Sequence, residues 1–176
     1  MILKLKRTPG IYLVGFMASG KTTIGRLLAD ELGWGFADLD EDIAAEQGRS
    51  IAEIFDTDGE DEFRKMERAA IRKRTGEVDR GRPMVVALGG GAFAYEGNHA
   101  LLENSGVTIW LDCPFSKVCA RVENTMHRPL ARDSEKFKQL YEDRRAAYRK
   151  ADHSIQIDSD DPSAIVKAIL KLPVFS

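Results

Sequence analysis

A chain of 176 residues is long enough for one compact domain, and its 43% hydrophobic and 31% charged residues supply both a core and a solvated surface. The formal net charge of −2 argues against general nucleic-acid binding, which requires a surplus of cationic side chains. No apolar stretch approaches the ~20 residues of a membrane span, and the first ten residues hold too short an apolar run for a signal peptide. Cys113 and Cys119 have the spacing of neither a zinc site nor a redox pair. We therefore expect a single cytoplasmic domain over residues 1–176, with neither nucleic acid nor a membrane as a partner.

Short apolar runs alternate with longer segments of helical periodicity along the chain. The predicted strands are 11–15, 35–39, 84–88, 107–111 and 154–157, and the predicted helices are 21–33, two between 50 and 76, 134–150 and 163–171. Residues 122–133 have weak periodicity and are predicted to form a mobile surface loop. This alternation predicts an α/β fold with a parallel sheet that helices cover on both faces.

The first predicted strand runs directly into a glycine-rich loop. Residues 15–22, GFMASGKT, fit the pattern G-x-x-x-x-G-K-[ST] between a strand and an amphipathic helix. Glycines keep side chains away, so that backbone N–H groups and the positive end of the following helix can surround phosphates. Lys21 can bridge the β- and γ-phosphates, and Thr22 can ligate Mg²⁺. The sequence therefore predicts a nucleoside triphosphate site with a magnesium ion.

Two carboxylates follow the second predicted strand. In Asp38-Leu39-Asp40 the acidic residues lie two apart, so on a strand they would point the same way at the carboxyl edge of the sheet. One could hold Mg²⁺ through water, and the other could accept the proton of a substrate hydroxyl. The alternative interpretation is that these residues cap a following helix.

Further candidates lie after these carboxylates along the chain. On a helix Glu67 would neighbour Arg64 and orient its guanidinium towards a carboxylate, although an ordinary surface ion pair is the alternative. The glycines 89–91 follow a buried strand and suggest backbone packed closely on a ligand, or else a flexible turn. In the predicted loop, Arg128 could close over the γ-phosphate. Later, Arg144 lies four residues before Tyr148 on one helix face, and either Arg144 or its neighbour Arg145 could be structural.

The order of these motifs resembles the shikimate kinase family. The matching segments are GFMASGKTTIGRLLA, DLD, SIAEIF, GEDEFRKMERAAI, ALGGGA, RPL and R-x-x-x-Y, which together run from about Gly15 to Asp158. The resemblance implies a three-layer P-loop NTPase fold with five parallel strands and a mobile lid at about 122–133. It also implies transfer of the γ-phosphoryl group of ATP to the 3-hydroxyl of shikimate, giving shikimate 3-phosphate and ADP on the route to chorismate and the aromatic amino acids.

The resemblance also implies roles for individual residues. The residues that it implies for nucleotide binding are Ala18, Ser19, Gly20, Lys21, Thr22, Thr23, Arg121, Arg128, Asp161 and Pro162. Shikimate binding falls to Asp40, Arg64, Gly89, Gly90, Gly91 and Arg144, with the substrate-binding subregion at about 40–70. The implied Mg²⁺ ligands are Thr22 and Asp38, and the implied catalytic residues are Lys21, Asp40 and Arg128.

Two features depart from the family pattern, and two other functions compete. Ala18 occupies a position where the family commonly has glycine, which is tolerable if its φ is negative. Ala131 and Arg132 replace a more usual leucine-rich continuation after RPL. One competing function is a kinase for another small polyol acid, such as gluconate, or for a nucleotide. The other is a nucleotide-dependent switch, which would need a water-positioning residue that neither Gln47 nor Gln139 offers in a suitable context.

Overall fold

Five strands form one parallel sheet in the computed structural model, which describes residues 10–126 and 134–175. The strands are β1 (Gly10–Val14), β2 (Gly35–Asp38), β3 (Met84–Ala87), β4 (Val107–Asp112) and β5 (His153–Gln156). They pair in the order β2-β3-β1-β4-β5, with every pair parallel. The predicted α/β fold with five parallel strands is confirmed, and each strand end lies within one residue of its predicted position.

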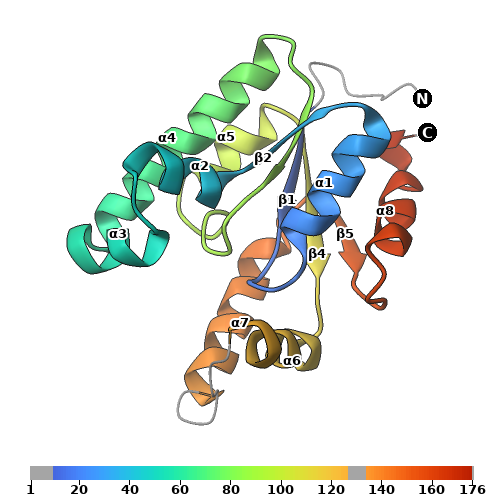
Figure 1. Ribbon diagram of the computed structural model, residues 1–176. Coiled ribbons are helices and arrows are strands. Elements are labelled where there is room, and N and C mark those ends of the chain that lie inside the picture. Colours follow the sequence, from blue (N-terminus) through green and yellow to red (C-terminus); the bar gives the residue numbers. More distant parts are fainter. Residues whose placement is uncertain (1–9, 127–133, 176) are drawn as a thin grey trace.

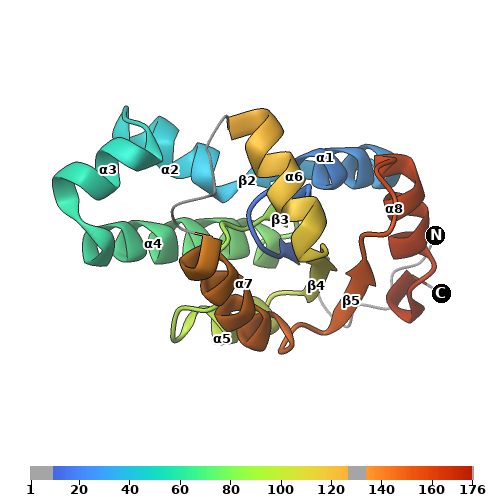
Figure 2. The same ribbon diagram turned by 90° about the horizontal axis from the view of Figure 1, so that it is seen from below.

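Helices cover both faces of this sheet. In Figures 1 and 2, α1 (Lys21–Leu32) and α8 (Pro162–Leu170) lie on one face, while α4 (Glu60–Asp79) and α5 (Asn98–Glu103) lie on the other. The short helices α2 (Leu39–Gln47) and α3 (Ile51–Asp58) lie beyond the β2 edge and pack against α4. Near the carboxyl ends of the strands lie α6 (Phe115–Met126) and α7 (Ser134–Tyr148). A 3₁₀ turn (Pro173–Phe175) closes the described chain.

The apolar character of the central strands explains this layering. All residues of β1, β3 and β4 are buried, as expected for parallel strands that are covered on both faces. The chain leaves β1 towards β2 on one side, and later adds β4 and β5 on the other side. Ligands of open α/β sheets bind where the strand order reverses in this way, at the carboxyl edge. The loop after β1 lies at that point.

Several boundaries differ from the sequence predictions. The prediction of a loop from residue 122 is wrong for residues 122–126, because α6 continues to Met126 and Val122 packs into the core with 2% exposure. The rest of the predicted lid, residues 127–133, lies outside the described residues. The helices α5 and α6 were not predicted, whereas α2 corresponds to the alternative interpretation in which Asp38 and Asp40 cap a following helix. In the described part of the chain, no helix is long and apolar enough to span a membrane.

Candidate active site

The loop between β1 and α1 encloses the side chain of Lys21. Its ammonium group donates to the carbonyl oxygens of Gly15 at 2.8 Å and Phe16 at 2.9 Å. Burial lowers the pKa of Lys21 to about 8, although the nearby carboxylates of Asp40 and Asp38 partly oppose this shift. The helix α1 begins after Gly20, which has a φ of 95° and offers no side-chain cap. The first-turn N–H groups and the positive helix end therefore face the same space as Lys21, which suits a polyphosphate.

Ala18 in this loop is the single described non-glycine residue with a positive φ, 60°. A negative φ, the condition under which alanine would be tolerable at this position, is therefore not met. The loop has to curl so that successive N–H groups converge on one point, and such curvature uses left-handed conformations. An L-residue adopts this conformation at a cost of roughly 1–2 kcal/mol.

Asp38 joins the end of β2 to the start of α1. The hydroxyl of Thr22 donates to Oδ2 of Asp38 at 2.5 Å. Oδ1 of Asp38 accepts from the N–H groups of Asp40 at 2.9 Å and Glu41 at 3.2 Å. Asp38 is therefore the N-cap of α2, and it also presents an oxygen beside Thr22. The expected strand geometry for Asp38 and Asp40 is wrong, because Asp40 lies in the first turn of α2. Hydroxyl and carboxylate oxygens are hard ligands that suit Mg²⁺, so the pair fits this ion.

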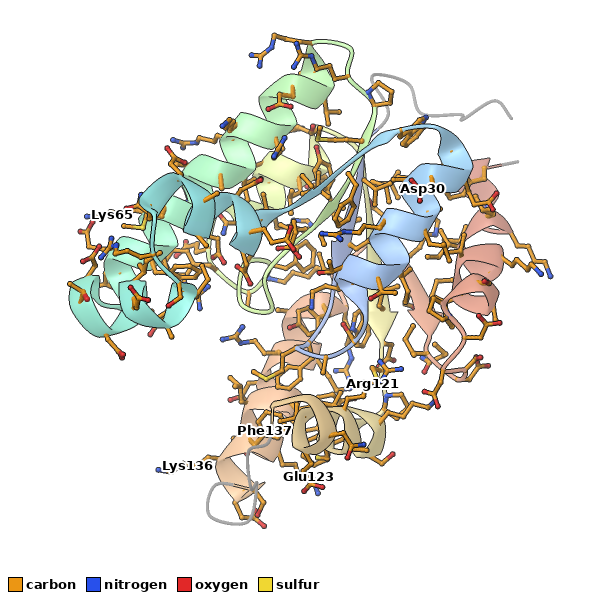
Figure 3. All side chains as sticks on the ribbon, viewed as in Figure 1. Asp30, Lys65, Arg121, Glu123, Lys136 and Phe137 are labelled. Carbon is orange, nitrogen blue, oxygen red and sulfur yellow. The ribbon has the colours of Figure 1, made fainter. Side chains whose placement is uncertain are left out.

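A cavity of about 570 Å³, the α6 pocket, opens between the glycine-rich loop, α6 and the segment before α8. Its lining includes Ala18, Gly20, Thr23, Arg121 and Pro162. Figure 3 shows Arg121 beside the loop that precedes α1, and its Nη1 donates to the Ala18 carbonyl at 2.9 Å.

Acidic residues follow β5 at the rim of the α6 pocket. Asp160 accepts from Lys117 at 3.0 Å and from Arg121 at 3.2 Å. Asp161 instead caps α8 through the Ser163 N–H group, so of the predicted pair 161–162 only Pro162 faces the cavity.

A second cavity of about 240 Å³, the α4 pocket, lies beside the same loop. Charged side chains meet there from three helices: Asp40 from α2, Arg64 and Glu67 from α4, and Arg144 from α7. Its apolar lining consists of Phe16, Met17, Ile51, Phe55, Phe63 and Leu140. Two guanidinium groups and two carboxylates between apolar walls suit a small molecule that carries both a carboxylate and hydroxyl groups. Burial and the nearby charge of Asp38 raise the pKa of Asp40, against the lowering effect of Lys21 and Arg64.

Arg64 is held in the wall of the α4 pocket by an acidic partner. Its Nη1 lies 2.9 Å from Oε1 of Glu67, and both side chains are buried. Burial raises the pKa of Glu67, and the Arg64 charge opposes that rise. The Nε atom of Arg64 is the one buried side-chain nitrogen or oxygen without a partner among the described residues. The guanidinium therefore keeps a donor beyond those that its acidic neighbour uses.

The glycines after β3 make room for these charged groups. A Cβ atom at Gly91 would lie 2.5 Å from Nη1 of Arg144 and 2.5 Å from Nη2 of Arg64. A Cβ atom at Gly89 would lie 2.8 Å from Oδ1 of Asp40. Neither glycine has a positive φ, so close approach rather than turn geometry explains the choice of glycine here.

The family model for shikimate kinase matches residues 17–172 of this chain. The chain belongs to the shikimate kinase family. It is 40% identical over 161 residues to a shikimate kinase of Persephonella marina, covering 91% of this chain and 96% of that relative. The crystal structure of shikimate kinase from Aquifex aeolicus is 36% identical, with a TM-score of 0.82, and covers 92% of this chain and 94% of that chain. A structure of shikimate kinase from Acinetobacter baumannii in complex with shikimate is 33% identical, with a TM-score of 0.83, and the match covers 93% of this chain and 91% of that chain.

Most of the predicted site residues lie in or beside the two pockets. All those predicted for the substrate line the α4 pocket, namely Asp40, Arg64, Gly89, Gly90, Gly91 and Arg144. Arg144 lines the pocket, whereas Arg145 pairs with Asp112, so the choice between the two arginines agrees with the geometry. Ser19 is fully buried inside the loop. Arg128 lies outside the described residues, and its predicted role stays a prediction.

Sequence reasoning missed some of the pocket walls. Met17, Phe63 and Leu140 were not singled out as site residues, because an apolar side chain in a pocket has the same pattern as one in the core. Asp160 and Lys117 were also missed, because a single charge in a loop or on a helix says nothing about its partner.

Proposed function

We propose that this shikimate kinase transfers the γ-phosphoryl group of ATP to the 3-hydroxyl of shikimate, giving shikimate 3-phosphate and ADP. The observation that carries the proposal is the arrangement of two pockets beside one loop. The α6 pocket borders the glycine-rich loop at Ala18 and Gly20, and the α4 pocket borders it at Phe16 and Met17. Lys21 is half-buried within that loop, and the nearby charge of Asp40 in the α4 pocket acts on its ammonium group. A donor and an acceptor can therefore meet at Lys21.

The residues of the α4 pocket support a role in holding the acceptor. Arg64 and Arg144 would pair with the shikimate carboxylate, since both guanidinium groups meet at Gly91. Asp40 would orient the attacking hydroxyl and accept its proton late in the reaction. Lys21 would stabilise charge on the transferred group, because phosphoryl transfer depends mainly on positioning and electrostatics.

The residues around Lys21 also fit a magnesium ion. Thr22 would bind it directly, and Asp38 would bind it through water, as the Thr22–Asp38 contact of 2.5 Å brings their oxygens together. When bound, the ion supplies charge that neutralises the phosphate oxygens. Arg128 would add a positive charge when the lid closes over ATP.

We further propose that the enzyme acts as a cytoplasmic monomer. Cys113 and Cys119 are free thiols, as is usual in a reducing compartment.

An ADP-release assay tests the function. Purified enzyme is given MgATP with shikimate, with gluconate or with no acceptor, and the phosphorylated product is identified by mass and ³¹P NMR. We expect ADP release with shikimate alone, and a phosphate monoester on the 3-oxygen. Turnover with gluconate would indicate a different polyol-acid kinase, and turnover without acceptor would indicate a nucleotide switch. Either result would overturn the proposal.

A further inference from the structure

We propose that Arg145 is a positioning residue for substrate binding: its ion pair with Asp112 fixes the rotation of α7, and so holds Arg144 in the α4 pocket. The inference rests on the proposed function of the α4 pocket as the acceptor site. Nothing requires Arg145 to contact a ligand, since the residue acts through its neighbour.

The anchor of this arrangement is Asp112, the last residue of β4. Its side chain is 7% exposed, and Nη1 of Arg145 lies 2.5 Å from its Oδ1. Nη2 of Arg145 lies 3.5 Å from Oδ2, which also accepts from the side-chain amide of Gln156 at 2.8 Å. A buried carboxylate needs such partners, because burial removes its hydration. Arg145 is therefore the cationic partner of the buried Asp112 carboxylate at the end of β4.

Aromatic side chains hold the Arg145 guanidinium from its sides. Its central carbon lies 5.0 Å from the ring centroid of Trp110 and 5.5 Å from that of Tyr141, within the range of cation–π contacts. Nη1 of Arg145 also donates to the Tyr141 hydroxyl at 3.1 Å, and that hydroxyl donates to the Cys113 carbonyl at 2.6 Å. These contacts tie α7 to the carboxyl end of β4 at a defined rotation.

The pocket side of α7 carries Arg144 and Tyr148. Tyr148 donates to the Gly90 carbonyl at 2.5 Å, and Arg144 packs beside Gly91. Consecutive residues of an α-helix point about 100° apart, so the direction of Arg145 sets the direction of Arg144. The two neighbours are chemically identical, so the contacts of α7 decide which arginine enters the pocket. The Asp112 carboxylate contributes to that choice by binding Arg145, together with the hydrogen bonds of Tyr141 and Tyr148.

The test is a double-mutant cycle on Arg144 and Arg145. Arg145→Gln, Arg144→Ala and the double variant are compared with the wild type by calorimetric titration with shikimate, and by the KM for MgATP. We expect Arg145→Gln to raise the shikimate Kd about tenfold, and to leave the MgATP KM within about twofold. In the Arg144→Ala background, Arg145→Gln should add less than about twofold, because the group through which it acts is gone. Lys138→Gln, an exposed change of the same charge on α7, is the matched control and should leave shikimate binding unchanged.

A second variant keeps the test decisive. Arg145→Lys retains the charge but loses the planar fork, so it should bind shikimate at a Kd between those of the wild type and Arg145→Gln. If Arg145→Gln does not fold, Arg145→Lys replaces it in the cycle under the same criteria. The inference would be overturned if the effects of the Arg144 and Arg145 changes on the shikimate Kd were fully additive. It would also be overturned if the Arg145 variant weakened shikimate and MgATP binding equally, or bound shikimate with wild-type affinity. A wild type that shows no shikimate-dependent turnover would instead overturn the proposed function.

Discussion

Arg64 and Glu67 form an ion pair inside the wall of the α4 pocket, with Nη1 2.9 Å from Oε1 and side-chain exposures of 8% and 1%. The two residues lie three apart on α4, so the helix itself brings the charges together. Removing either partner of such a pair destabilises the folded protein, because the remaining charge stays buried without a partner. If the α4 pocket binds the substrate as proposed, Glu67 would act on it through the orientation of Arg64.

We expect Glu67→Gln to raise the shikimate KM by about tenfold, with little change in the MgATP KM, because Arg64 loses its charged partner and its fixed orientation. The free energy of unfolding should fall by about 3 kcal/mol, the lower end for broken buried pairs. Steady-state kinetics and urea denaturation measure the two effects. Glu62→Gln is the control, because Glu62 forms an exposed pair with Lys65 on the same helix. Equal kinetics for both variants would contradict the role of Glu67.

The glycine segment 89–91 gives a second prediction. Gly91→Ala should abolish measurable shikimate binding, because the new methyl group would lie 2.5 Å from both Arg64 and Arg144 and displace them. ATP binding should persist, since Gly91 does not line the α6 pocket. Calorimetric titration with each ligand separates the two outcomes.

The control for this change is Gly76→Ala on α4, where the nearest neighbour of the new methyl group is the end of the Arg80 side chain at 3.6 Å. It should raise the free energy of unfolding by about 0.5–1 kcal/mol, as alanine is the better helix former, and leave shikimate binding intact. If Gly91→Ala bound shikimate as Gly76→Ala does, the glycines would have no spatial role.

The pH dependence should have two limbs of different origin. Burial lowers the pKa of Lys21 to about 8, so its neutral form gains population above that pH and kcat/KM for MgATP should fall on the alkaline side. Burial raises the pKa of Asp40, so its neutral form persists to a higher pH than in an exposed aspartate, and kcat/KM for shikimate should fall on the acid side. Profiles of kcat/KM between about pH 5 and 10, each with the other substrate saturating, separate the limbs. A MgATP profile that stays flat to pH 9.5 would rule out Lys21 as the charged contact.

Much of this site could be predicted from sequence because its parts follow strands directly. The glycine-rich loop and the glycines 89–91 stand at strand ends, and a parallel sheet brings such ends to one edge. The pairing of Arg64 with Glu67 follows from helical spacing alone. These are local patterns, and the fold converts them into a site without further information.

Other features depend on distant partners, and the local sequence does not contain them. The strand rule failed for Asp40 because the chain turns into α2 at Leu39, a helix with little amphipathic pattern to announce it. The helix α6 overlaps the predicted lid because Val122 finds a core position that only the folded chain provides. The Asp112–Arg145 pair joins residues 33 apart in sequence, so neither residue indicates the other.

Ala18 gives the last prediction, since its φ of 60° places an L-residue in the left-handed region that favours glycine. Ala18→Gly should raise the free energy of unfolding by about 0.5–1 kcal/mol: relief of roughly 1–2 kcal/mol of strain exceeds the added flexibility of the unfolded chain. Urea denaturation measures this gain, and Ala146→Gly, an exposed position within α7, should instead lose about 1 kcal/mol. The MgATP KM should stay within about twofold, because glycine adopts the same curl and keeps the carbonyl that accepts from Arg121. A loss of stability equal to that of Ala146→Gly would mean that the loop holds Ala18 without strain.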